Sequence, residues 1–110
     1  MIQDTLKKIE EKIKLARVGS DETRQELLRL VNDLNGELND LQITHADQAR
    51  NIAEFTQVAA DQATREGTTP VLAKPALDGL TSSVAEFELT HPKLVSLVQA
   101  FCTTLSNAGI

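Results

Sequence analysis

Apolar side chains recur along most of the chain at intervals of three and four residues, the spacing of one face of an α-helix. The first stripe consists of Ile2, Leu6, Ile9, Ile13 and Ala16. It stops before Gly19, and Ser20 or Asp21 then suits the N-cap of a second helix. The spacing resumes with Leu27, Val31, Leu34, Leu38 and Leu41. Because so short a turn separates the two stripes, residues 1–41 are predicted to form an antiparallel helical hairpin.

Residues 42–66 allow two interpretations. Thr44 followed by Asp47 resembles a capping pair, which would begin a third, alanine-rich helix. That helix would carry on one face Ala49, Ile52, Thr56, Ala59 and Ala63. However, the segment contains no glycine or proline, and the earlier spacing continues through His45, Gln48, Ile52, Phe55 and Ala59. A single long helix over residues 21–66 is therefore the alternative to two shorter helices.

The remainder of the chain is predicted to form a loop and two helices. Residues 67–75 have the glycine, threonine and proline content of a loop, and Pro75 suits the first position of the following helix. A proline disfavours helical geometry in the residue before it, so that helix should stop by Thr90, while Pro92 fits the first turn of the last helix. The two apolar stripes are Leu77, Leu80, Val84 and Phe87, then Leu94, Val98, Phe101, Leu105 and Ala108. Residues 76–110 should thus form a C-terminal helix pair.

The composition favours a single all-α domain over residues 1–110. A chain of 110 residues suits one hydrophobic core. The chain has three phenylalanines and no tryptophan or tyrosine, so the core must be filled mainly by leucine, isoleucine, valine and alanine. Such a core suits helices better than a sheet, which favours aromatic and β-branched residues. We expect an antiparallel bundle of four to five helices that combines the N-terminal hairpin with the C-terminal helix pair.

The charge distribution argues against a nucleic-acid binder. The net charge is −5, whereas binding to phosphates requires a basic surface. Residues 1–17 are nevertheless basic, and residues 18–66 are acidic. The simplest interpretation is intramolecular: the basic helix lies beside an acidic neighbour. The alternative is that Lys7, Lys8, Lys12 and Lys14 bind an acidic partner or an anionic membrane surface.

The expected compartment is the cytoplasm. Charged residues interrupt any apolar core of a secretory signal near the start, and no apolar run approaches the roughly 20 residues that span a bilayer. The single cysteine, Cys102, has no partner for an internal disulfide. It flanks the last apolar stripe with no basic residue within one helical turn, so we expect a structural, buried thiol.

Two short motifs resemble parts of a di-metal site. Glu88-x-x-His91 has the letters of one ligand pair, and Gln42-x-x-His45 resembles an incomplete second copy. A di-iron bundle needs two complete pairs within continuous helices, together with two further carboxylates. We therefore expect no metal. Instead, Thr90 or His91 should cap the last helix, and Glu88 should favour the positive end of that helix.

No catalytic or cofactor-binding motif is evident. Eleven residues along one helix would place Cys102 and His91 about 16 Å apart, too far for a nucleophile and its base. The chain also contains no glycine-rich phosphate loop, no nucleophile elbow and no zinc-type cysteine spacing. We expect a protein that is not an enzyme and has no cofactor.

The last residues predict a helix cap. Gly109 suits the left-handed position after the final helix, and Ile110 would then fold back onto Leu105 in a Schellman motif. We expect the domain to end with this cap.

These C-terminal residues also carry a resemblance to a known family. The matching positions are Phe87-Glu88, His91-Pro92, Leu94, Leu105 and Gly109-Ile110. They resemble the C-terminal signature of a small, uncharacterised bacterial family, and the hairpin of residues 2–41 is similar to the N-terminal helices of that family. Residues 42–79 depart from it, being longer and richer in alanine than the expected linker. The resemblance implies a compact helical fold and no assigned reaction.

The function that these features favour is protein interaction. We expect a non-enzymatic helical protein that self-associates, since its apolar stripes exceed what one short bundle hides. The first alternative is an accessory or chaperone-like module that binds another protein through a helical groove. The second is a membrane-peripheral protein that uses its basic first helix without inserting stably into the bilayer.

Overall fold

The computed structural model describes residues 2–15, 20–64 and 70–107, and these contain helices but no strand. The elements are α1 (Ile2–Leu15), α2 (Asp21–Thr44), α3 (Ala46–Thr64), α4 (Pro70–Val84), the short 3₁₀ helix η1 (Ala85–Phe87) and α5 (Pro92–Asn107). The prediction of an all-α bundle is therefore confirmed.

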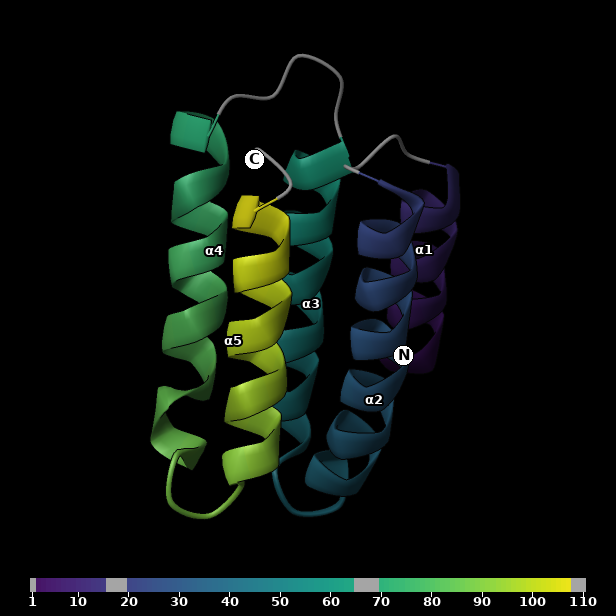
Figure 1. Ribbon diagram of the computed structural model, residues 1–110. Helices are drawn as coiled ribbons and strands as arrows, with labels where there is room; N and C mark the ends of the chain where they lie inside the picture. The colour runs from purple at the N-terminus through teal and green to yellow at the C-terminus, as the bar shows by residue number, and fades with distance from the viewer. Residues whose placement is uncertain (1, 16–19, 65–69, 108–110) are drawn as a thin grey trace.

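Consecutive helices run antiparallel, as Figure 1 shows. Helices α2, α3, α4 and α5 form a four-helix ring in which α2 packs against α3, α3 against α4, α4 against α5, and α5 against α2. The first helix, α1, packs against α2 and α3 and lies on the side of the bundle opposite α4 (Figure 1). Among the described helices, α1 alone packs on the outside of the ring, and it covers the α2–α3 side.

The first hairpin forms as its pattern predicts. Every described residue of the first stripe is buried, namely Ile2, Leu6, Ile9 and Ile13. Burial of each such side chain contributes about 1.5–3 kcal/mol, which fixes α1 on the ring despite its many charges. The second helix begins after Ser20, whose hydroxyl accepts a hydrogen bond from the backbone N–H of Thr23 at 3.2 Å. Of the two predicted caps, Ser20 is the one used.

The chain reverses direction at His45, so the described residues 21–64 form two helices and not one. The N–H of His45 donates to the carbonyl of Leu41 at 2.8 Å, and the carbonyl of His45 accepts from Ala49 at 2.9 Å. His45 therefore ends α2 and begins α3. The predicted capping role of Thr44 is wrong, because its hydroxyl contacts Nδ1 of His45 instead, at 2.8 Å.

The third helix has the apolar face expected for it. Four predicted residues are buried: Ala49, Ile52, Thr56 and Ala59. Thr56 satisfies its hydroxyl by donating to the carbonyl of Ile52 at 2.8 Å. Because most buried residues of α3 are alanines, this helix can approach α1, α2 and α4 closely.

The prediction that residues 67–75 form a loop is wrong for its second half. Helix α4 begins at Pro70, and Pro75 lies inside it. Proline fits the first helical position without loss, whereas an interior proline removes one backbone hydrogen bond. The packing of α4 along α3 offsets that loss. The prediction that Pro75 begins this helix is therefore wrong, because Pro70 begins it.

The junction before the last helix is built from backbone hydrogen bonds. The N–H of His91 donates to the carbonyl of Phe87 at 2.7 Å, and the carbonyl of His91 accepts from Val95 at 3.3 Å. Pro92 is the first residue of α5, as predicted. The Thr90 hydroxyl lies 3.0 Å from Nδ1 of His91. His91 stands at the N-cap position of α5, and a capping hydrogen bond from its side chain or from that of Thr90 stays a prediction.

The predicted C-terminal cap lies partly outside the described residues. Leu105 is buried in the core, in line with its place in the last stripe. Gly109 and Ile110 lie beyond the described part of α5. Their Schellman motif stays a prediction.

Candidate functional site

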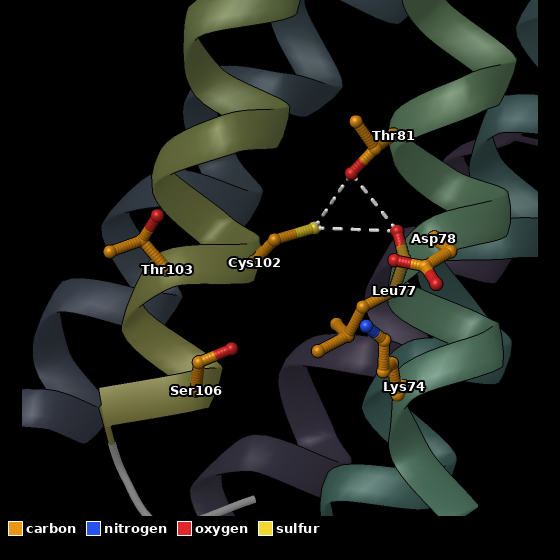
Figure 2. A pocket seen from close by; sticks show the side chains of 7 residues that line it. All are labelled: Lys74, Leu77, Asp78, Thr81, Cys102, Thr103 and Ser106. Atoms are coloured by element: carbon orange, nitrogen blue, oxygen red, sulfur yellow. Dashed lines mark hydrogen bonds between the residues drawn. The ribbon is translucent and has the colours of Figure 1, made fainter. Parts of the chain in front are cut away.

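A groove lies between α4 and α5, on the side of the ring that α1 does not cover. It has a volume of about 440 Å³. Figure 2 shows the side chains that line it. Those from α4 are Lys74, Leu77, Asp78 and Thr81, and those from α5 are Cys102, Thr103 and Ser106. We call this the α4–α5 groove.

Helical periodicity places these residues together. Positions three and four apart share one face of a helix, so Lys74, Asp78 and Thr81 align along α4. Cys102 and Ser106 align in the same way along α5. The groove stays open because short side chains, among them Thr81, Cys102 and Ser106, stand where a larger residue would fill the gap between the helices.

Cys102 and Thr81 link the two helices at the floor of the groove. The Thr81 hydroxyl donates to the carbonyl of Leu77 at 3.0 Å. The Cys102 thiol points from α5 towards α4, where its sulfur lies 3.8 Å from Oγ1 of Thr81 and 3.9 Å from the Leu77 carbonyl oxygen (Figure 2). These long sulfur contacts are weak, so the thiol acts mainly as a packing group.

The electrostatic surroundings keep this thiol protonated. Burial raises the pKa of Cys102, and the negative charge of Asp78 raises it further. The hydrogen bond with Thr81 lowers the pKa, but burial outweighs it. A reactive cysteine needs the opposite environment, in which positive charge stabilises the thiolate. The groove therefore does not activate Cys102 as a nucleophile.

The groove lies on the part of the molecule that carries the fewest charges. Charged residues in α4 and α5 are limited to Lys74, Asp78 and Lys93, whereas α1 alone has seven in 14 residues. Lys74 and Asp78 are exposed at the rim, and neither forms an ion pair with any residue that the structure describes. Among the described residues, the rim thus offers one cation and one anion that form no ion pair.

The two histidines meet at the end of the bundle where α2 joins α3 and η1 joins α5. The ring centroids of His45 and His91 are 6.3 Å apart. The buried ring of Phe87 lies 5.3 Å from His45 and 5.5 Å from His91, in edge-to-face orientation to both. This aromatic cluster connects the two junctions of the ring, a favourable arrangement for aromatic side chains.

The two incomplete metal motifs therefore come together through their histidines alone. The described residues contain no group of three or more histidine, cysteine, aspartate or glutamate side chains arranged to hold a metal ion. The contact between the two histidines was not predicted from the sequence. Its signal is the repeat of Thr44-His45 in Thr90-His91, where each threonine hydroxyl contacts Nδ1 of the following histidine.

One of the four lysine side chains of the basic first helix contacts a neighbouring helix of the bundle. Lys12 forms an ion pair with Asp61 of α3, in line with the intramolecular interpretation of the charge pattern. Lys7, Lys8 and Lys14 are exposed. No helix in the described ranges is long and apolar enough to cross a membrane.

The described residues thus form a bundle of five α-helices with a groove between α4 and α5. The chain belongs to the family described as a domain of unknown function (DUF4404), which matches residues 27–110. This match confirms that the family is an uncharacterised one. The matched range includes residues 42–79, whose expected departure from the family stays a prediction. No curated protein and no solved structure matches the chain.

Proposed function

We propose that this chain is a non-enzymatic, cytoplasmic protein-interaction module that self-associates. The observation that supports the proposal is the uncovered α4–α5 side of the ring. One side of the ring is covered by α1, whereas no described helix packs over the outer face of α4 and α5. This outer face combines a groove with a low charge density, and protein interfaces are depleted of charged residues at their centre.

We predicted from the sequence that the apolar stripes exceed what one bundle can bury, but this excess does not support self-association. The stripes of all five helices are largely buried within the bundle. Large apolar side chains that stay exposed are Leu15, Ile43, Phe55, Val58 and Leu89. Phe55 and Val58 line one small hollow on α3, and Leu15, Ile43 and Leu89 lie in other parts of the chain; exposed apolar residues in such small groups are normal on soluble proteins. We therefore infer self-association from the outer face of α4 and α5.

The proposal of a non-enzymatic role rests on the chemistry of the groove. A general base or nucleophile there would need a group whose pKa suits proton transfer near neutral pH. The Cys102 thiol has a pKa above its ordinary value, and both histidines lie at the junctions His45 and His91. The hydroxyls of Thr81, Thr103 and Ser106 therefore have no histidine base among the lining residues.

A second candidate is an accessory module that binds another protein through the same groove. The volume of about 440 Å³ is enough to receive side chains of a partner helix. This function predicts a monomer when the protein is purified alone. A peripheral membrane role is third, because Lys12 is already paired with Asp61.

Size-exclusion chromatography with light scattering distinguishes these functions. Self-association predicts a mass of twice 12.0 kDa that falls towards 12.0 kDa on dilution. A mass of 12.0 kDa at every concentration up to the solubility limit would contradict self-association and favour the accessory module.

A further inference from the structure

We propose that two copies of this chain dock through their α4–α5 grooves, with α4 antiparallel to α4 of the second copy and Lys74 facing Asp78 across the interface. This inference rests on the proposed self-association and names its interface. The partner is a second copy of this chain, because Lys74 of each copy complements the charge of Asp78 in the other.

The positions of the two rim charges favour an isologous dimer. In such a dimer, the two-fold axis lies in the plane of the interface and each surface meets its own copy. An axis perpendicular to the helices makes α4 antiparallel to its copy. If that axis passes at the level of Ala76, Lys74 and Asp78 lie at equal distances on either side of it. Each lysine then faces the aspartate of the second copy, and two ion pairs form.

The other two-fold arrangement leaves these charges without partners. An axis parallel to the helices would place α4 opposite α5 of the second copy. Helix α5 contains no aspartate or glutamate, and its one lysine, Lys93, lies at the far end from the groove. Lys74 would then have no anion to meet. The antiparallel arrangement of α4 is therefore the one that the charges favour.

The α5 side of the groove is compatible with contact between identical residues. Cys102 contacts Leu77, so an axis at the level of Ala76 crosses α5 near Thr103, and the exposed Thr103 side chain approaches its counterpart. A hydroxyl both donates and accepts hydrogen bonds, so it can pair with its own copy, whereas a charged side chain would repel it. Short side chains also permit the close approach of packed helices, about 8–10 Å between axes.

The rest of the surface is less suited to self-contact. Helices α1 and α2 carry most of the charges of the chain, and the net charge is −5. Like charges placed opposite each other in an interface disfavour association. The α4–α5 side has one exposed lysine and one exposed aspartate at the groove, so its local charge is balanced.

The interface is small enough for these two ion pairs to matter. Helix α4 has 15 residues and is about 22 Å long. A face of this length and two helices wide, about 20 Å, covers roughly 450 Å² per copy, which is the size of a weak interface and not of a stable one. A reversal of charge at each pair should therefore change the dissociation constant visibly.

The test is a charge swap followed by measurement of the dimer dissociation constant by sedimentation equilibrium. Lys74→Glu places two carboxylates opposite each other at each pair, and Asp78→Lys places two ammonium groups there. Each single variant should raise the dissociation constant by about tenfold or more. The double variant Lys74→Glu/Asp78→Lys restores opposite charges, and its dissociation constant should return to within about threefold of the original.

Two controls distinguish a weakened interface from a loss of folding. Lys8→Glu makes the same charge change on the exposed side of α1 and should leave the dissociation constant unchanged. Circular dichroism and the denaturation midpoint should show that each variant stays folded, since Lys74 and Asp78 also neighbour each other within α4.

The outcomes discriminate between this inference and the proposed function. A wild-type dimer that none of the swaps affects would place the interface elsewhere, which overturns the inference and leaves self-association standing. If the dissociation constant of the double variant is as high as those of the single variants, Lys74 and Asp78 do not face each other. This result also overturns the inference. A wild-type monomer would overturn self-association and this interface together.

Discussion

The ring of Phe55 in α3 packs directly against the backbone of Gly79 in α4. A Cβ atom added to Gly79 would lie 3.0 Å from Cε1 and 3.2 Å from Cδ1 of that ring. The other helical glycine of the described residues, Gly36, has no heavy atom within 4 Å of such a Cβ position. The two glycines therefore differ in what a methyl group would meet, although both lie inside helices.

Replacement of the two glycines by alanine should stabilise the protein unequally. Glycine inside a helix is about 0.8–1 kcal/mol less favourable than alanine. Gly36→Ala should gain that full amount in the free energy of unfolding. Gly79→Ala should gain less, because the ring of Phe55, which is 40% exposed, must shift to admit the methyl group. Urea denaturation measures both changes.

A double-mutant cycle isolates the contribution of the ring. In a Phe55→Ala background, Gly79→Ala should gain as much as Gly36→Ala does, since the obstacle is gone. Equal gains from Gly79→Ala with and without Phe55 would show that the ring does not restrict this position.

The cap of the second helix should contribute measurably to stability. Ser20→Ala removes the hydrogen bond that its hydroxyl accepts from Thr23 and should lower the free energy of unfolding by about 1 kcal/mol. Ser96→Ala serves as the matched control, because Ser96 is exposed within α5, where alanine is the better helix former. Thermal denaturation should give a lower midpoint for the first variant and an unchanged or higher midpoint for the second.

The aromatic cluster should couple the two junctions of the ring energetically. His91→Ala removes contacts with His45 and Phe87 and the contact with the Thr90 hydroxyl, so it should cost about 1–2 kcal/mol. Combined with His45→Ala, the loss should differ from the sum of the single losses by at least about 0.5 kcal/mol. Chemical denaturation of the four proteins in the cycle provides the measurement.

A distant pair tests whether that coupling is specific. Ser20→Ala and His91→Ala share no contact, so their effects should add within about 0.5 kcal/mol. If the stability losses of His45→Ala and His91→Ala also add, the two rings lie near each other without energetic coupling, which would contradict the prediction.

Most of the fold follows from local sequence pattern. The first stripe predicted the buried face of α1, and Ser20 predicted the start of α2, because both depend on residues within a few positions of each other. The start of α4 was not predictable in this way. Pro70 and Pro75 both suit a first helical turn, and only the packing of α4 along α3 decides between them.

The α4–α5 groove was not predictable from the pattern. The contact between Thr81 and Cys102 joins residues 21 positions apart, and it depends on how α4 and α5 align after the turn between them. The same holds for His45 and His91, which the chain brings together from two separate junctions. Periodicity assigns a residue to a face of its own helix, but the register between helices is a property of the folded core.

The titration of Cys102 tests the environment of the groove directly. Burial raises its pKa above the ordinary value of 9.0, so the midpoint of the rise in ultraviolet absorbance of the thiolate should lie above that pH. The chain has no tyrosine or tryptophan and one cysteine, which makes this absorbance a clean signal. Asp78→Asn removes a charge that raises the pKa and should shift the titration to lower pH. Thr81→Val removes a hydrogen bond that lowers the pKa and should shift the titration to higher pH.

The same pKa difference fixes how stability depends on pH. Since the pKa is higher in the folded protein than in the unfolded chain, the unfolded chain releases the thiol proton first as the pH rises. The free energy of unfolding should therefore fall as the pH rises above the unfolded pKa, and Cys102→Ala should remove that part of the pH dependence. Asp47→Asn on the exposed face of α3 is the control and should leave the thiol titration unchanged. A thiolate that forms below the ordinary pKa would contradict the unreactive groove and reopen a catalytic role for Cys102.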